Sequence, residues 1–277
     1  MRNSDSESSL RLKIDVGTES TEVIVYDDGP REGFVLFILH GWGSSANLMQ
    51  PLSSRLSPFW RTIRIDMPGH GASPPPPSAW GVPQHVELLE NIANELQIKE
   101  CAIIGHSNGG RIALELASRA DKRLDPAFLV LNSPSGIKRK RSPQYYVRLW
   151  TARILKLPFA VLPGPLKEAG LDWLRHSVVW SWLGSSDYRA LSGVMRETFV
   201  QTVNHYVTPR LSQITCPVLV FWGTKDDAIS RGQMDELVSL LPDAGFFELE
   251  NAGHYGYLDQ PDTIAAAVKD LVGGLPS

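Results

Sequence analysis

Hydrophobic positions along the chain follow two alternating patterns. Short apolar runs rich in Val, Ile, Leu and Phe alternate with longer stretches in which apolar residues recur every three or four positions. Several of the runs have no polar residue between the apolar ones, which is typical of strands buried on both faces of a parallel sheet. The predicted strands cover residues 22–26, 34–39, 62–65, 102–104, 128–131, 218–222 and 246–249.

Helical periodicity fills the stretches between these runs. Val86, Leu89, Ala93 and Leu96 are spaced to form one apolar stripe, which predicts a helix over residues 83–97. The same pattern predicts helices over residues 109–120, 232–241 and 262–272. Repeated alternation of strand and helix indicates an α/β fold with helices on both faces of the sheet.

Two parts of the chain depart from this alternation. Residues 134–210 contain no convincing strand and are enriched in Arg, Lys, Trp, Tyr and Pro, so we interpret them as a helical insertion after the strand at 128–131. Residues 1–21 begin with a polar, Ser-rich stretch and are predicted to be a flexible N-terminal tail. The predicted core therefore consists of residues 22–133 and 211–277.

Composition narrows the class of protein. The 277 residues are 43% hydrophobic and carry a net charge of −3, which fits a globular enzyme and argues against a nucleic-acid binder. The longest apolar runs fall far short of the ~20 residues that a membrane helix needs. Two cysteines form no disulfide framework, and the first residues lack a signal-peptide pattern. We therefore expect a cytoplasmic protein with free thiols and no membrane or nucleic-acid partner.

The strongest chemical signal is the pentapeptide Gly-His-Ser-Asn-Gly at positions 105–109. An apolar strand leads into it and a helical pattern follows directly, which is the context of a nucleophile elbow. A sharp turn of this kind would present Ser107 as a nucleophile, with Gly105 and Gly109 at positions where a Cβ atom would clash. Backbone amides at the start of the helix would then point to the place where an oxyanion forms.

With this motif, the chain from residue 22 to residue 271 resembles the α/β-hydrolase family. The stretches 66–73 and 218–226 resemble loops and strands common in that family. The resemblance implies a mostly parallel sheet of about eight strands flanked by helices. It also implies that residues 134–210 form a helical lid, and that the chemistry needs no cofactor.

A serine nucleophile needs a base, and the base needs a carboxylate that orients it. The family order is Ser, then an acid, then His. His254 alone among the seven histidines lies beyond the strand at 218–222, and it follows the last predicted strand. Asp226 and Asp227 are both candidates for the acid. The spacing from Gly223 resembles the family pattern and selects Asp226, with Asp227 as the alternative.

The resemblance also assigns the oxyanion hole and part of the substrate pocket. The backbone N–H groups of Trp42 and Asn108 would hold the oxyanion. The Trp42 ring, together with Tyr145 and Trp150 from the insertion, is expected either to pack within the protein or to contact an apolar, medium-sized substrate. The four basic residues at positions 138–141 form either a solvated face or a site that attracts an anionic substrate group.

A dinucleotide-binding alternative arises from residues 41–46, which match Gly-x-Gly-x-x-Ala after a strand. Asp66 at the end of the next strand would be its ribose ligand. However, another strand precedes the motif, and this interpretation leaves Ser107, Asp226 and His254 unexplained. The chain also carries no metal-binding or phosphate-loop signature.

The sequence thus predicts a serine hydrolase that cleaves a carboxylic ester or a related acyl bond through an acyl-enzyme. The same residues would serve a thioesterase, a lactonase or a C–C bond hydrolase. A protein of another class, a receptor that binds a ligand in this pocket with little turnover, is the remaining alternative. The sequence does not determine the oligomeric state.

Overall fold

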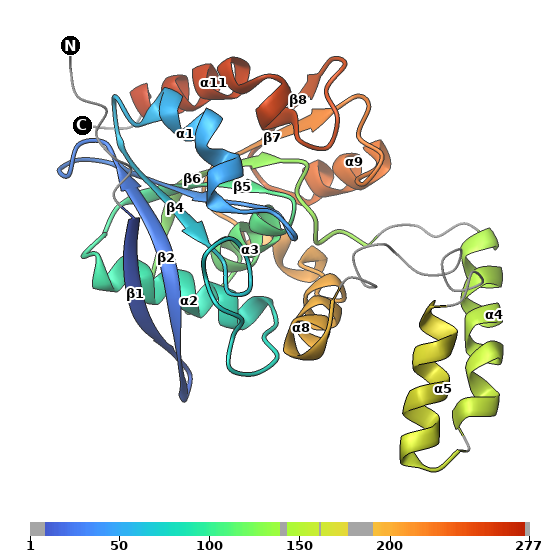
Figure 1. Ribbon diagram of the computed structural model, residues 1–277. Helices are drawn as coiled ribbons and strands as arrows, with labels where there is room; N and C mark the ends of the chain where they lie inside the picture. Colours follow the sequence, from blue (N-terminus) through green and yellow to red (C-terminus); the bar gives the residue numbers. More distant parts are fainter. Residues whose placement is uncertain (1–8, 139–142, 161, 177–190, 275–277) are drawn as a thin grey trace.

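A sheet of eight strands runs through the protein, with helices on both of its faces (Figure 1). The computed structural model describes residues 9–138, 143–160, 162–176 and 191–274. The strands are β1 (Ser9–Val16), β2 (Glu19–Asp28), β3 (Val35–Leu39), β4 (Arg61–Asp66), β5 (Cys101–His106), β6 (Pro126–Asn132), β7 (Val218–Gly223) and β8 (Ala244–Leu249).

The strand order is β1-β2-β4-β3-β5-β6-β7-β8. The β1–β2 and β2–β4 pairs are antiparallel, and every pair from β4 to β8 is parallel. The prediction of a mostly parallel sheet is confirmed. In such a sheet the carboxyl ends of the parallel strands meet at one edge, where ligands normally bind.

Helices connect the strands and cover the sheet. The helices are α1 (Gln50–Leu56), α2 (Val82–Glu95), α3 (Asn108–Ala117), α4 (Pro143–Ala160), α5 (Gly164–His176), α8 (Gly193–Val203), α9 (Arg231–Leu240), α10 (Gly256–Asp259) and α11 (Pro261–Gly273), with the 3-10 helices η1 (Ala46–Met49) and η2 (Thr208–Gln213). The four helices predicted in the core are all present as α2, α3, α9 and α11, with ends shifted by a few residues.

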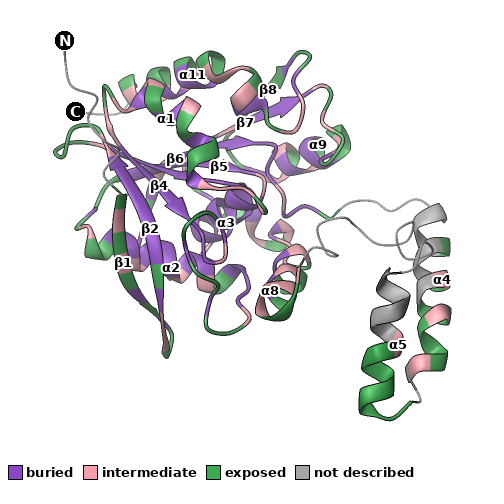
Figure 2. Ribbon diagram, viewed as in Figure 1, coloured by how far each residue is buried: buried purple, intermediate pink, exposed green. Residues whose placement is uncertain are grey.

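Strand β3 shows how the two faces of the core form. Val35, Phe37 and Leu39 join the apolar cluster that includes α2, α3 and α9, whereas Leu36 and Ile38 join the cluster beneath α1 and α11. All five side chains are buried, as Figure 2 shows for the central strands. Each buried aliphatic side chain contributes about 1.5–3 kcal/mol, so the apolar runs specify the centre of the sheet.

The structure corrects the prediction of a flexible tail over residues 1–21. Residues 9–21 form β1 and the start of β2, whereas residues 1–8 lie outside the described chain. In β1 the apolar residues alternate with exposed charged ones, and Ile14 and Val16 are buried against the core. This alternation is the pattern of a strand with one face toward solvent, and it begins directly after the polar stretch on which the prediction of a tail rests.

Most of the described residues in the insertion predicted over residues 134–210 are helical. Helix α4 packs against α5, and the pair stands apart from the sheet, whereas α8 lies against the core (Figure 1). The docking of α8 includes a hydrogen bond from the backbone N–H of Trp80 to Thr198 Oγ1 at 3.1 Å. No helix in the described part of the chain is both long enough and apolar enough to cross a membrane. The role of this insertion as a lid remains a prediction.

Candidate active site

Ser107 stands at the turn between β5 and α3. Its backbone has φ 50° and ψ −108°, a conformation that residues other than glycine rarely adopt. Its N–H donates to the Asn132 carbonyl at 3.1 Å, and its own carbonyl accepts the N–H groups of Arg111 at 3.1 Å and Ser135 at 2.9 Å. The strained turn is therefore held by three backbone hydrogen bonds, as expected where strain belongs to a functional site.

The glycines of the motif let backbone segments cross closely at this turn. A Cβ atom on Gly105 would lie 2.7 Å from the Cα atom of Gly110. A Cβ atom on Gly109 would lie 2.6 Å from the carbonyl carbon of Leu39, at the end of β3. Both positions exclude any side chain, so the sequence motif reflects the packing of the elbow itself.

Asp226 and His254 form a buried carboxylate–imidazole pair on the loops that follow β7 and β8. Asp226 Oδ2 lies 3.0 Å from His254 Nδ1, and its side chain is 0% exposed. Asp226 Oδ1 accepts the N–H groups of Ala228 and Ile229, each at 2.9 Å. Burial acts to raise the pKa of Asp226, but the hydrogen bonds from His254 and Ile229 outweigh it and hold the pKa below its ordinary value. The ionised carboxylate therefore fixes Nδ1 as the protonated ring nitrogen.

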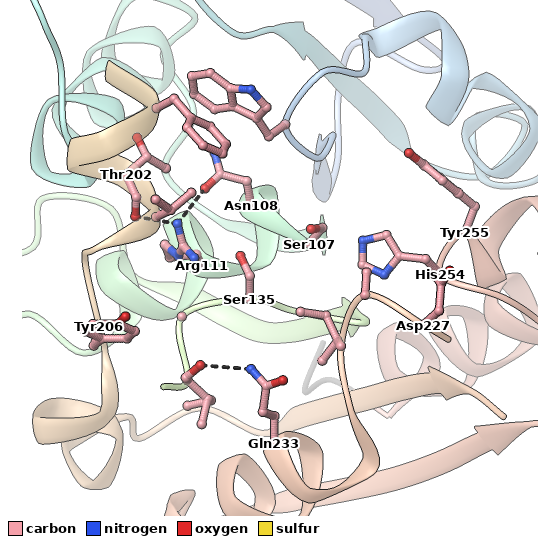
Figure 3. Close-up of a pocket in the computed structure, with 17 residues that line it drawn as sticks. Ser107, Asn108, Arg111, Ser135, Thr202, Tyr206, Asp227, Gln233, His254 and Tyr255 are labelled. Carbon is pink, nitrogen blue, oxygen red and sulfur yellow. Dashed lines mark hydrogen bonds between the residues drawn. The ribbon is translucent and has the colours of Figure 1, made fainter. Parts of the chain in front are cut away.

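His254 and Ser107 both line one pocket, which has a volume of about 500 Å³. Figure 3 shows His254 beside Ser107. Because Asp226 occupies Nδ1, Nε2 is the nitrogen left to accept a proton. Asp227 lines the same pocket but is exposed, and the carboxylate that meets His254 is Asp226.

His106 and Asn132 support the His254 loop. The His106 ring is buried with its centroid 4.7 Å from that of His254, and burial lowers the pKa of His106 to about 3, helped by the neighbouring His254. The Asn132 side-chain amide donates to the His254 carbonyl at 3.1 Å. His106 is therefore a neutral packing partner of His254. Sequence reasoning missed Asn132, which lies 122 positions from His254 and carries no motif.

The loop after β3 brings Trp42 to the pocket beside Asn108 and Ser107. His40 fixes the start of this loop, because its Nε2 accepts the Met67 N–H at 3.1 Å and its Nδ1–H therefore donates to the Gly41 carbonyl at 2.7 Å. Burial lowers the pKa of His40 to about 3, which keeps this ring neutral. The Trp42 ring packs between His70 and Phe199, at centroid distances of 4.8 and 5.1 Å.

Of the two substrate contacts expected from α4, the structure describes the side chain of Trp150 alone. Trp150 is 59% exposed on α4 and does not line the pocket, and the side chain of Tyr145 lies outside the described residues. From the insertion, the pocket is lined by Phe199 and Thr202 of α8 and by Tyr206. Helix α4 packs against α5, and the described apolar residues of its stripe, Trp150, Ile154 and Leu157, are exposed.

Competing chemistries find less support in the described residues. Asp66, the ribose ligand of the dinucleotide alternative, is buried and accepts the N–H groups of Ala46 at 2.7 Å and Ala72 at 2.9 Å. Burial raises the pKa of the Cys101 and Cys216 thiols to about 12 and about 11, which disfavours a thiolate nucleophile. Within the described ranges no group of His, Cys, Asp and Glu could hold a metal ion.

The elbow and the carboxylate–imidazole pair lie at the carboxyl ends of parallel strands, as the corresponding groups do in α/β-hydrolases. Residues 35–267 match the model of the Alpha/beta hydrolase family, and the chain belongs to that family. The expectations of an α/β-hydrolase fold and of a hydrolase are confirmed.

Three known proteins illustrate this similarity. The chain is 26% identical over 250 residues to a pimeloyl-[acyl-carrier protein] methyl ester esterase of Nitrosomonas europaea, covering 85% of this chain and 94% of that one. It is 40% identical over 94 residues to a magnesium-chelatase 30 kDa subunit of Rhodobacter capsulatus, covering 34% of this chain and 33% of that one. The solved esterase from Exiguobacterium antarcticum has a TM-score of 0.70 and 18% identity, covering 96% and 100% of the two chains, and shares the fold.

Proposed function

We propose that this protein is a serine hydrolase that cleaves a carboxylic ester through an acyl-enzyme. The observation that carries the proposal is the Asp226–His254 hydrogen bond of 3.0 Å on the wall of the pocket that contains Ser107 at its strained elbow. An oriented imidazole beside a strained serine is the arrangement that makes a hydroxyl nucleophilic.

In the proposed reaction, Ser107 Oγ attacks the ester carbonyl and His254 Nε2 takes its proton. The backbone N–H groups of Trp42 and Asn108 stabilise the oxyanion, each contributing ~3 kcal/mol in the transition state. His254 then gives its proton to the leaving alcohol, and Ser107 keeps the acyl group. A water molecule, activated by the same imidazole, attacks the acyl-enzyme and releases the acid.

The ester is the bond favoured by the similar proteins, because the relative from Nitrosomonas europaea is named as a methyl ester esterase. A thioester, a lactone or a C–C bond would use the same groups in the same order. The receptor alternative has no use for a buried carboxylate that orients an imidazole, so the Asp226–His254 pair favours turnover over binding alone.

The Ser107→Ala variant tests this proposal. With p-nitrophenyl butyrate we expect Ser107→Ala to lower kcat by at least about 10³-fold, since the nucleophile is removed while the fold is kept. A fluorophosphonate probe should label the wild type at Ser107 and should not label the variant. Ser54→Ala, which changes an exposed serine of α1, is the matched control. Full activity or persistent labelling of Ser107→Ala would refute the assignment.

A further inference from the structure

Arg111 is a buried cation on the wall of the pocket. It lies one turn after Ser107 on α3 and is 7% exposed. Both of its side-chain hydrogen bonds use Nη1, one to Asn108 Oδ1 at 3.4 Å and one to the Thr202 carbonyl. Its Nε has no partner among the described residues.

Among the described residues, Arg111 has no acidic partner. By contrast, Arg64, which is also buried, pairs with Asp28 at 2.8 Å. Asp227 also lines the pocket, but Figure 3 shows it on the far side, beyond His254. Burial lowers the pKa of Arg111 to about 10, so the guanidinium is still charged at neutral pH. Burying an unpaired charge destabilises the fold by several kcal/mol, and buried charges are therefore normally paired with an opposite charge. An anionic ligand would supply that partner for Arg111.

A purely structural role does not account for this arginine. The Thr202 carbonyl at the end of α8 already accepts the N–H of His205 at 3.1 Å, so it does not depend on Arg111. A neutral side chain with one hydrogen-bond donor could make the same link between α3 and α8. The charge and the remaining N–H groups of the guanidinium are left for another acceptor.

The position of Arg111 relative to His254 indicates which part of a substrate it meets. In Figure 3 the two side chains lie on opposite sides of Ser107. His254 must reach the leaving alcohol to protonate it, so the alcohol lies on the His254 side and the acyl group extends toward Arg111. Ser135, Thr202 and Tyr206 line the pocket near Arg111, and Thr202 Oγ1 is also without a partner in the described chain.

We infer that Arg111 binds a carboxylate at the far end of the acyl group, so that the substrate is a monoester of a short dicarboxylic acid. The inference rests on the proposed ester hydrolysis. The planar guanidinium matches a carboxylate in bidentate geometry. One helical turn, about 5.4 Å, separates Ser107 from Arg111 along α3, which suits an acyl chain of a few carbons.

The test compares two esters that differ in this group, monoethyl glutarate and ethyl pentanoate, with acid release followed by pH-stat titration. Arg111→Gln should lower kcat/KM for monoethyl glutarate by about 10–100-fold more than for ethyl pentanoate, the range expected for a charge-assisted hydrogen bond. Arg111→Lys, which keeps the charge, should recover part of this difference. Arg11→Gln, in the exposed Arg11–Glu22 pair of β1, is the matched control and should leave both substrates unaffected.

Binding provides a second readout that does not depend on turnover or on an Arg111 variant. Glutarate titrated into Ser107→Ala by calorimetry should bind at least ten-fold more tightly than pentanoate. Equal losses of Arg111→Gln on both esters, or equal binding of the two acids, would overturn the inference. If the wild type cleaves p-nitrophenyl butyrate but neither of these esters, the inference alone is overturned, whereas loss of activity on p-nitrophenyl butyrate as well would refute the proposed function.

Discussion

The adjacent carboxylates of Asp226 and Asp227 differ in burial and in hydrogen bonding. Asp226 is buried, accepts two backbone N–H groups and meets His254, whereas Asp227 is exposed at the pocket wall. Neighbouring residues on a loop point in different directions, so one of the pair can orient the imidazole and the other cannot. The spacing from Gly223 selected Asp226 from the sequence, and the hydrogen bond to His254 agrees with that choice.

The corresponding prediction compares Asp226→Asn with Asp227→Asn. Asp226→Asn should lower kcat on p-nitrophenyl butyrate by about 10³–10⁴-fold, because an amide favours the wrong tautomer of His254. Asp227→Asn should change kcat by less than about tenfold, since its carboxylate makes no contact with the imidazole. Steady-state kinetics of both purified variants would check this, and a larger loss in Asp227→Asn would reverse the assignment of the acid.

At the scale of elements, the elbow between β5 and α3 is set by glycines and not by the serine. Gly105 allows the backbone of Gly110 to approach, and Gly109 allows the end of β3 to approach. These close approaches place the N-terminus of α3 directly behind Ser107. The geometry of Ser107, the proposed nucleophile, therefore depends on neighbouring glycines that have no side chain to take part in the chemistry.

Gly105→Ala tests that dependence. The added Cβ would lie 2.7 Å from backbone atoms of Gly110, so we expect the free energy of unfolding to fall by about 1–3 kcal/mol and kcat to fall with it. Gly232→Ala is the matched control, because a Cβ there meets nothing within 4 Å in α9 and should add up to about 1 kcal/mol of stability. Urea unfolding measures both, and equal stability of the two variants would contradict the packing argument.

The elements that the sequence predicted correctly are those whose burial pattern is local. Strand β3 is apolar at every position because it is covered on both faces, so its sequence alone identifies it. Strand β1 was missed because its alternating residues begin directly after the polar, Ser-rich first residues, so that the two together resemble a single tail. The contribution of α8 to the pocket was also missed, since nothing in its composition distinguishes a helix that lines a site from one that covers a surface.

At the scale of the whole molecule, the site depends on contacts between distant segments. Ser107, Asp226 and His254 could be named in advance because each follows a recognisable strand. Asn132 and Arg111 could not, because their roles come from contacts with His254 and Thr202, which lie 122 and 91 positions away in the chain. A side chain whose partner is set by the fold carries no local signal in the sequence.

Buried neutral histidines predict how the stability of the whole fold depends on pH. Burial lowers the pKa of His40 and His106 to about 3 and that of His85 to about 4, from an ordinary value of 6.5. Below pH 6.5 the unfolded chain therefore binds more protons than the folded one, and stability is lost as the pH falls from 6.5 toward 4. At pH 4.5 each of these histidines should lower the free energy of unfolding by about 2 kcal/mol relative to neutral pH.

His85→Asn isolates one of these contributions away from the pocket. Asn can replace the hydrogen bond that His85 Nδ1 makes to the Gly81 carbonyl at 2.7 Å, but it does not titrate. The loss of unfolding free energy between pH 7.5 and pH 4.5, measured by urea titration, should be smaller in His85→Asn by about 2 kcal/mol. An unchanged difference would mean that His85 is protonated in the folded protein.

Strand β8 is the last strand of the sheet and pairs with β7 alone, and most of its residues are at least partly exposed. The loop that carries His254 follows it, whereas Ser107 follows β5 in the middle of the sheet. Edge strands open more readily than central ones. Fraying at this edge would displace His254, the proposed base, while Ser107 is still held in place, so activity would be lost at a lower temperature than the fold.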